Sequence, residues 1–214
     1  MKIVIAQHKG GVGKTTLAVH ITGVLADNGL DKILLMDCDS QSDSFRFFTK
    51  QIPSKSMEIK EGMDGVDVLW NYKREKLSNK NRFSEYDHIV VDIDTRVQNA
   101  LQVITEIEPD IILIPIDKQY LSVEHLPEVL SLIARKEGII NYPTEVKIVQ
   151  MGSTHNLSNL LSSLKNKPKY LNPNFSIPYL EIEFNNSLRD GRYVWGYSLD
   201  IDIKNIFKGV IYNG

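Results

Sequence analysis

Short runs of apolar residues, rich in isoleucine and valine, recur along the chain and are separated by longer mixed stretches. Within each run, polar residues do not alternate with apolar ones, so both faces of the segment are apolar. This pattern is typical of strands in a parallel sheet that helices cover on both sides. We predict strands at Ile3–Ala6, Ile33–Met36, Ile89–Val91, Ile111–Ile116 and Val146–Met151.

Helical periodicity appears between the predicted strands. Apolar residues of 17–25 fall on one face at helical spacing, and Gly29 is placed to end that helix. A second predicted helix has Ser122 as its N-cap and Gly138 at its end, with Pro127 near its first turn. Strands that alternate with helices form βαβ units. The predicted fold class is therefore α/β, a doubly wound and mostly parallel sheet flanked by helices.

Size and composition fit one compact unit. The 214 residues are 42% hydrophobic, which suits one sizeable core, and we expect a single domain over residues 1–214. Residues 50–82 differ, because they are polar, contain Gly62 and Gly65, and end in the basic run Lys73–Arg82. We predict that residues 50–82 are an excursion from the sheet with a short helix or two.

Charge and cysteine content narrow the function classes. A formal net charge of −2 excludes a strongly basic, histone-like nucleic-acid binder but is compatible with a local basic patch. The single cysteine, Cys38, cannot form a disulfide framework or a multi-cysteine metal site within one chain. No apolar run reaches the roughly 18 residues of a membrane span, and no signal peptide precedes the first strand. We expect a cytoplasmic protein.

A glycine-rich segment follows the first predicted strand and precedes the first predicted helix. Glycines let backbone N–H groups surround phosphate oxygens, and the positive end of the helix points at them. Lys14 would place a charge on the β and γ phosphates, and the Thr15 hydroxyl would ligate Mg²⁺. His8 stands where the usual motif has its first glycine. The predicted nucleotide-binding residues are Lys9, Gly10, Gly11, Val12, Gly13, Lys14, Thr15 and Thr16.

Acidic residues follow two of the predicted strands. Asp37 and Asp39 come after Ile33–Met36, and Asp92 ends the strand that begins at Ile89. In open α/β sheets ligands bind beyond the carboxyl ends of the strands, so these side chains should face phosphates. An apolar strand that ends in aspartate is typical of a Mg²⁺-binding Walker B segment. An ordinary turn role for Asp37 and Asp39 stays open.

The segment Lys9–Thr16 resembles the deviant Walker A loop of the ParA/MinD family of ATPases, which have a SIMIBI-like P-loop NTPase fold. The resemblance implies ATP and Mg²⁺ as cofactors, and a lysine, Lys9, that reaches the other subunit's phosphates in a nucleotide-sandwich dimer. Residues 37–41 resemble the family's D-x-D-P-Q segment, with Ser40 in place of proline. Asp39 would orient or activate the attacking water. By this resemblance the catalytic residues are Asp39, Lys9 and Lys14, and the metal residues are Thr15, Asp37 and Asp92.

Two segments depart from the family pattern. Ile93-Asp94-Thr95-Arg96 replaces the usual small residues, so Asp94 is either a second acid of the site or an exposed loop residue. Gln150-Met151-Gly152 stands where relatives often have the asparagine that holds adenine, which leaves the contact to the base open. Residues 176–191 resemble the family's C-terminal pattern of proline, helix and glycine.

Several functions share this loop. The iron–sulfur relatives require paired cysteines, which this sequence lacks. The resemblance favours a ParA-type partition ATPase associated with the nucleoid. Such proteins form a homodimer on ATP, bind DNA without sequence preference, and hydrolyse ATP when an adaptor protein of the ParB type stimulates them. The cargo would be a plasmid, a chromosome origin or a protein compartment such as a carboxysome.

Three alternatives stay open. A MinD-like positioning ATPase would bind membrane through its C-terminal helix. Here Ile203–Tyr212 contains only two lysines and follows Asp200 and Asp202, which favours a helix packed on the domain and no membrane partner. A small-molecule kinase or ligase of the dethiobiotin synthetase type would use the same loop and acids. The third alternative is a nucleotide-gated adaptor with negligible turnover.

Basic residues become more frequent toward the C-terminus. Residues 143–214 contain 8 Lys+Arg and 6 Asp+Glu, a balance of +2, whereas residues 1–142 contain 17 and 21, a balance of −4. A dimer would double any basic patch and so raise its affinity for a phosphate backbone. An ordinary solvated surface is the alternative. The candidate DNA-contacting residues are Lys165, Lys167, Lys169, Arg189, Arg192, Lys204 and Lys208.

Overall fold

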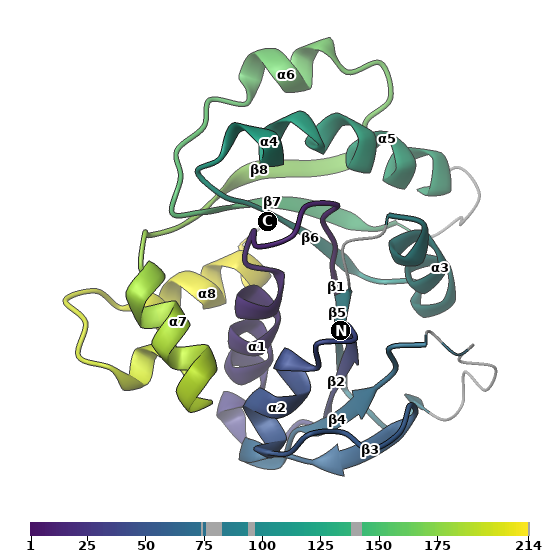
Figure 1. Ribbon diagram of the computed structural model, residues 1–214. Coiled ribbons are helices and arrows are strands. Elements are labelled where there is room, and N and C mark those ends of the chain that lie inside the picture. Colours follow the sequence, from purple (N-terminus) through teal and green to yellow (C-terminus); the bar gives the residue numbers. More distant parts are fainter. Residues whose placement is uncertain (74, 76–82, 94–96, 138–142, 214) are drawn as a thin grey trace.

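One eight-stranded sheet forms the centre of the structure, a computed structural model that describes residues 1–73, 75, 83–93, 97–137 and 143–213. The strand order is β3-β4-β2-β5-β1-β6-β7-β8 (Figure 1). Neighbouring strands are parallel except β3, which runs antiparallel to β4. The strands are β1 Lys2–Ile5, β2 Ile33–Cys38, β3 Glu58–Glu61, β4 Asp67–Trp70, β5 His88–Ile93, β6 Ile111–Ile116, β7 Glu145–Met151 and β8 Tyr170–Ile177.

Helices cover both faces of the sheet (Figure 1). Successive strand residues point to opposite sides. Ile3 and Ile5 accordingly join a core with α1, α2, α7 and α8, whereas Val4 and Ala6 join a second core with α3 and α5. The doubly wound α/β prediction is confirmed. The helices are α1 Lys14–Leu25, α2 Asp43–Thr49, α3 Val97–Ile107, α4 Tyr120–Glu124, α5 Leu126–Glu137, α6 Ser158–Ser163, α7 Glu181–Asp190 and α8 Ile203–Tyr212, with short 3₁₀ turns η1 Ala26–Asn28, η2 Met63–Gly65 and η4 Val194–Gly196.

The five strands predicted from apolar runs are present as β1, β2, β5, β6 and β7, with ends within two residues of those expected. The prediction that residues 50–82 leave the sheet is wrong, because β3 and β4 extend it at one edge. β3 has the mostly polar sequence Glu58-Ile59-Lys60-Glu61, since an edge strand keeps part of its surface in water. Residues 74 and 76–82, most of the basic run, lie outside the described residues.

The predicted helix caps have a mixed outcome. Gly29 has a φ of 63° and ends the η1 turn that continues α1, as expected. Ser122, however, is not an N-cap, because α4 begins after Gln119 and the Ser122 hydroxyl donates to the Gln119 carbonyl at 2.8 Å. A second helix, α5, then begins at Leu126, and the predicted stop at Gly138 lies outside the described residues.

The C-terminal helix packs against the rest of the protein, as the sequence favoured. Its apolar face, Ile203, Phe207, Val210 and Ile211, is buried in the core that contains α1. The side chain of Lys147 on β7, only 1% exposed, donates from Nζ to the carbonyls of Ile211 (3.1 Å) and Asn213 (2.9 Å). This lysine satisfies carbonyls that the end of a helix leaves without partners.

We expect Lys147→Met to lower the free energy of unfolding by about 1–3 kcal/mol, because the buried carbonyl of Ile211 and the partly buried carbonyl of Asn213 lose their donor. Urea denaturation followed by circular dichroism measures this value. Lys208→Met is the matched control, since the ion pair of Lys208 with Asp27 is solvent-exposed and contributes less than about 1 kcal/mol. Equal unfolding midpoints for Lys147→Met and the wild type would contradict the assigned role.

Candidate nucleotide site

The glycine-rich loop joins β1 to α1 at the carboxyl edge of the sheet. Gly11 and Gly13 have φ angles of 76° and 92°, in the left-handed region where side chains are strained. Gly13 is the N-cap of α1 and supplies no side-chain acceptor, so the first N–H groups of the helix point toward the loop without a capping oxygen. Backbone of this form at a helix N-terminus is an anion-binding cradle.

Two lysines of the loop contact nearby oxygens. Lys14 is 7% exposed, and its Nζ donates to the Lys9 carbonyl at 3.0 Å. Lys9 forms an ion pair with Asp117, just after β6, at 3.0 Å and donates to the Gln119 side chain at 2.8 Å. Burial raises the pKa of Asp117, but hydrogen bonds from Ser122 and Lys9 outweigh it, and the pKa lies below its usual range. Lys9 therefore has a charged partner within its own subunit.

Asp37 and Asp92 lie opposite each other on β2 and β5, and both are buried. The Asp37 carboxylate accepts the backbone N–H groups of Asp39 (2.9 Å) and Phe45 (2.8 Å). Asp92 is hydrogen-bonded to the Thr15 side chain, and its Oδ2 has no hydrogen-bond partner among the described residues. Burial raises the pKa of Asp37 to about 6 and that of Asp92 to about 7, the latter with help from the charge of Asp37.

This arrangement fits a bound Mg²⁺. Asp92 has a buried oxygen without a hydrogen-bond partner among the described residues, and the Thr15 hydroxyl lies beside it, so two of the three predicted metal residues are in contact. Asp37 is adjacent but uses its oxygens on backbone N–H groups, which fits an indirect contact better than a direct one. The described residues contain no cluster of three or more acidic, histidine or cysteine ligands. A cation here would therefore take further ligands from phosphate and water, as Mg²⁺ usually does.

Asp39 lies at the start of the loop between β2 and α2. Its Oδ1 accepts the N–H of Gln41 at 3.0 Å, and its carbonyl accepts the indole N–H of Trp70 at 2.9 Å. Asp39 is only partly buried, in contrast to Asp37. Asp94, the other acid considered for the site, lies outside the described residues.

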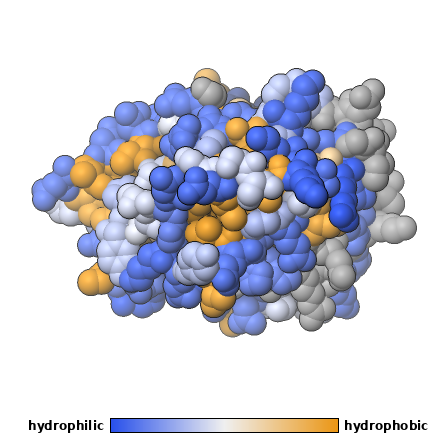
Figure 2. Space-filling view, turned by 90° about the horizontal axis from the view of Figure 1, so that it is seen from above, coloured by the Kyte–Doolittle hydropathy of each residue, from blue (hydrophilic) through white to orange (hydrophobic). Residues whose placement is uncertain are grey.

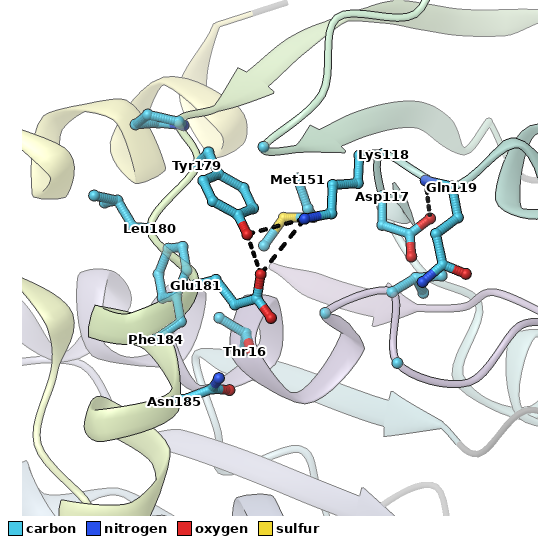
Figure 3. Close-up of a pocket in the computed structure, with 15 residues that line it drawn as sticks. Thr16, Asp117, Lys118, Gln119, Met151, Tyr179, Leu180, Glu181, Phe184 and Asn185 are labelled. Atoms are coloured by element: carbon cyan, nitrogen blue, oxygen red, sulfur yellow. Dashed lines mark hydrogen bonds and ion pairs between the residues drawn. The ribbon is translucent and has the colours of Figure 1, made fainter.

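A pocket opens beside the loop (Figure 3). Across it, the Lys118 Nζ contacts the Tyr179 hydroxyl at 2.9 Å and Glu181 at 3.6 Å, and Tyr179 donates to Glu181. Gln150, which stands near the family's adenine-binding position, instead bonds both backbone groups of His155. The lining residues are Gly11, Val12, Gly13, Thr16, Asp117, Lys118, Gln119, Met151, Gly152, Pro178, Tyr179, Leu180, Glu181, Phe184 and Asn185.

Sequence reasoning did not identify the wall formed by residues 117–119 and 178–181. One signal was available, because Asp117 directly follows the apolar run Ile111–Ile116, as Asp37 and Asp92 follow theirs. No comparable signal marks Tyr179, since its place depends on β8, whose mixed sequence did not indicate a strand.

The seven candidate DNA-contacting residues fall into two groups. Lys165, Lys167 and Lys169 are exposed before the amino end of β8, whereas the nucleotide loop lies at the carboxyl edge. The second group lies on α7 and α8 or just after α7: Lys204 and Lys208 both pair with Asp27, Arg189 pairs with Asp190, and Arg192 donates to the Gly196 carbonyl. Each of these four side chains therefore already has a partner within the protein.

Seen from above, the surface is mainly hydrophilic, with apolar side chains in small groups (Figure 2). Among the residues that the structure describes, no helix combines the length and apolar character needed to cross a membrane.

Comparisons with known proteins agree with this geometry. A profile of the family described as "CobQ/CobB/MinD/ParA nucleotide binding domain" matches residues 3–206. The chain is 23% identical over 179 residues to the chromosome partitioning protein ParA of Caulobacter vibrioides, an alignment that spans 68% of this chain and 66% of that protein.

Two solved structures share the fold at low sequence identity. Apo McdA of Cyanothece superposes with a TM-score of 0.75 at 18% identity, covering 98% of this chain and 97% of that chain. A putative plasmid partition protein from Borrelia burgdorferi B31, bound to AMPPNP, gives a TM-score of 0.64 at 21% identity, covering 98% and 96%.

The buried acid pair yields a prediction about pH. The pKa of Asp92 is higher in the folded than in the unfolded protein, so its ionisation destabilises the fold as pH rises from about 4 to about 7. We expect Asp92→Asn to raise the free energy of unfolding at pH 8 by on the order of 2 kcal/mol, and this gain to shrink as pH falls to 5.

Chemical denaturation at both pH values, without nucleotide or Mg²⁺, measures this difference. Glu124→Gln serves as the control, because Glu124 is exposed and its replacement removes no buried charge. We expect this variant and the wild type to have similar free energies of unfolding. A variant that is less stable than the wild type at pH 8 would show that burial of the Asp92 charge is not costly.

Proposed function

Because the chain belongs to the CobQ/CobB/MinD/ParA nucleotide-binding domain family, we propose that it is an ATPase that dimerises on ATP and partitions or positions a cargo. One observation carries the proposal. The loop with left-handed Gly11 and Gly13 lies beside a buried acid pair in which one oxygen of Asp92 has no hydrogen-bond partner within the described part of the chain. An anion cradle next to a buried carboxylate oxygen that can ligate a cation is what a Mg²⁺–triphosphate requires.

The proposed division of roles follows the contacts. The loop N–H groups and Lys14 would hold the phosphates. They would stabilise the negative charge on the phosphate oxygens in the transition state of hydrolysis. Thr15 and Asp92 would hold Mg²⁺, and Asp37 would support its hydration shell. Asp39, at the rim of the site, would orient the attacking water. Mg²⁺ itself supplies charge neutralisation between the β and γ phosphates.

We propose that on dimerisation Lys9 leaves its partners within the subunit and binds the triphosphate held by the second subunit. In the structure Lys9 is paired with Asp117 and Gln119. A triphosphate of the second subunit carries more negative charge than one carboxylate, so it can compete for this lysine. Beside Gln119, Tyr120 and Leu121 are 71% and 53% exposed, and a second subunit would cover apolar side chains placed there.

The proposed partners follow from the relatives and from the basic residues. Two of the relatives named above, ParA of Caulobacter vibrioides and the putative plasmid partition protein of Borrelia burgdorferi, act in chromosome or plasmid partition by their names, which supports DNA and an adaptor protein of the ParB type as partners. The exposed lysines 165, 167 and 169 are the members of the candidate set with the greatest freedom to meet a phosphate backbone. A cytoplasmic, nucleoid-associated location and a single domain over 1–214 are part of the proposal. The proposed cargo is one of three kinds, namely a plasmid, a chromosome origin or a protein compartment.

Lys9→Ala tests the dimer. We expect this variant to bind ATP with near-native affinity, because the loop N–H groups and Lys14 remain, but to stay monomeric, because the proposed contact across the interface is lost. Asp117→Asn should dimerise at lower ATP concentration than the wild type, because Lys9 is released. Light scattering after gel filtration with ATP and Mg²⁺ gives the molar mass, and Lys167→Ala is the exposed-lysine control. Dimerisation of Lys9→Ala at wild-type concentrations would remove Lys9 from the interface.

Asp39→Ala tests hydrolysis and DNA binding together. We expect ATP to bind, turnover to fall about 100-fold, and the trapped dimer to retard DNA of random sequence. Retardation should weaken steeply with salt, because lysine–phosphate contacts release counterions. Lys14→Ala, which should not bind ATP, is the negative control. Unchanged turnover excludes Asp39 from the mechanism, and slow turnover without DNA binding at low salt excludes the DNA partner.

A further inference from the structure

The backbone of Asp39 is fixed from two sides. Its N–H donates to Oδ1 of the buried Asp37 at 2.9 Å, and its carbonyl accepts the Trp70 indole N–H at 2.9 Å. The same carbonyl accepts the N–H of Ser42 at 3.3 Å, which closes the turn. The indole bond connects this carbonyl to a different element of the sheet, since Trp70 is the last residue of β4.

Trp70 is itself held firmly. Its Cα is opposite Asp37 in the parallel pairing of β2 and β4, and its carbonyl accepts the N–H of Met57 at 2.7 Å. The next residue, Asn71, donates its N–H to the Asp37 carbonyl at 2.8 Å. The indole stacks on Tyr72 with ring centroids 4.3 Å apart and an interplanar angle of 25°. These contacts fix the direction of the indole N–H relative to the sheet.

We propose that Trp70 is a positioning residue for Asp39, which sets the direction of the carboxylate that orients the attacking water. The inference rests on the proposed function, because it assumes that Asp39 acts in hydrolysis. Two hydrogen bonds to the N–H and C=O of one residue fix both of its peptide planes, and they thereby fix the path of its Cα–Cβ bond. The side chains of Ser40 and Gln41, which follow, are exposed, and the Gln41 carbonyl accepts a hydrogen bond from the Arg46 side chain at 3.2 Å.

Trp70→Phe removes the indole N–H and keeps an aromatic ring beside Tyr72. We expect kcat for ATP hydrolysis to fall about five- to tenfold, as for the loss of one hydrogen bond that acts in the transition state. The Kd for a fluorescent ATP analogue should stay within about twofold, because the phosphate-binding groups are untouched. Trp195→Phe, the same change in the aromatic cluster around His20, should leave kcat within about twofold.

A second replacement covers the case in which Trp70→Phe does not fold. In the Trp195→Phe background, tryptophan analogue incorporation places β-(3-benzothienyl)alanine at position 70, where sulfur replaces the indole N–H at nearly constant shape. A fall in kcat with unchanged Kd supports the inference. A kcat equal to that of the background overturns it, as does an equal loss of kcat and ATP affinity, which indicates a general structural role.

Asp39→Ala distinguishes this inference from the proposed function. If Asp39→Ala slows hydrolysis and removal of the Trp70 N–H does not, Asp39 acts but Trp70 does not position it. If Asp39→Ala hydrolyses ATP at the wild-type rate, the role of Asp39 fails, and the inference about Trp70 fails with it.

Discussion

Asp37 and Asp92 are adjacent on β2 and β5, and the parallel register leaves neither carboxyl group a route to water. Two acids in a medium of low dielectric constant repel each other and lose hydration, and both effects raise their pKa values. The surrounding structure compensates the two carboxyl groups to different extents. Asp37 accepts two backbone N–H groups from the following loop and so organises it, whereas Asp92 keeps one oxygen without a partner among the described residues. The strain is therefore concentrated at the position where a cation would relieve it.

Helix α1 connects this edge of the sheet with the C-terminal segment. All of its residues except Thr15 are buried, so the helix is covered on every side and not only on the apolar face predicted from the sequence. His20 lies at its centre, bonded through Nδ1 to the Thr16 carbonyl at 2.6 Å and stacked on Phe207 of α8. Its Nε2 accepts the N–H of Val194 at 3.0 Å, and burial lowers its pKa to about 4, so it is neutral near pH 7. His20 thus connects α1, the helix that begins at the nucleotide loop, with α8 through packed aromatic rings.

The elements that could be predicted from the sequence are those whose signal lies within one short segment of the chain. A central strand such as Ile111–Ile116 is apolar on both faces, and Gly13 with Lys14 marks a loop between strand and helix, so neither needs a distant partner to be identified. Three strands were missed. β3 and β8 are edge strands, whose polar residues depend on their place in the sheet, and β4 is an internal strand of only four residues.

The same limit applies to the candidate site. Asp39 and Asp92 were identifiable because each follows an apolar run, which places it at the carboxyl edge. Asp117 also follows an apolar run, but its pairing with Lys9 could not be predicted, and neither could the bond of Trp70 to Asp39, since these partners are far apart in the chain and meet only after the strands pair. Each loop charge in the structure has a protein partner: Lys9 has Asp117, and Lys14 has the Lys9 carbonyl. Under the proposed function, a nucleotide gains affinity only by replacing these internal contacts with better ones, so the pair of Lys9 with Asp117 sets the threshold for dimerisation.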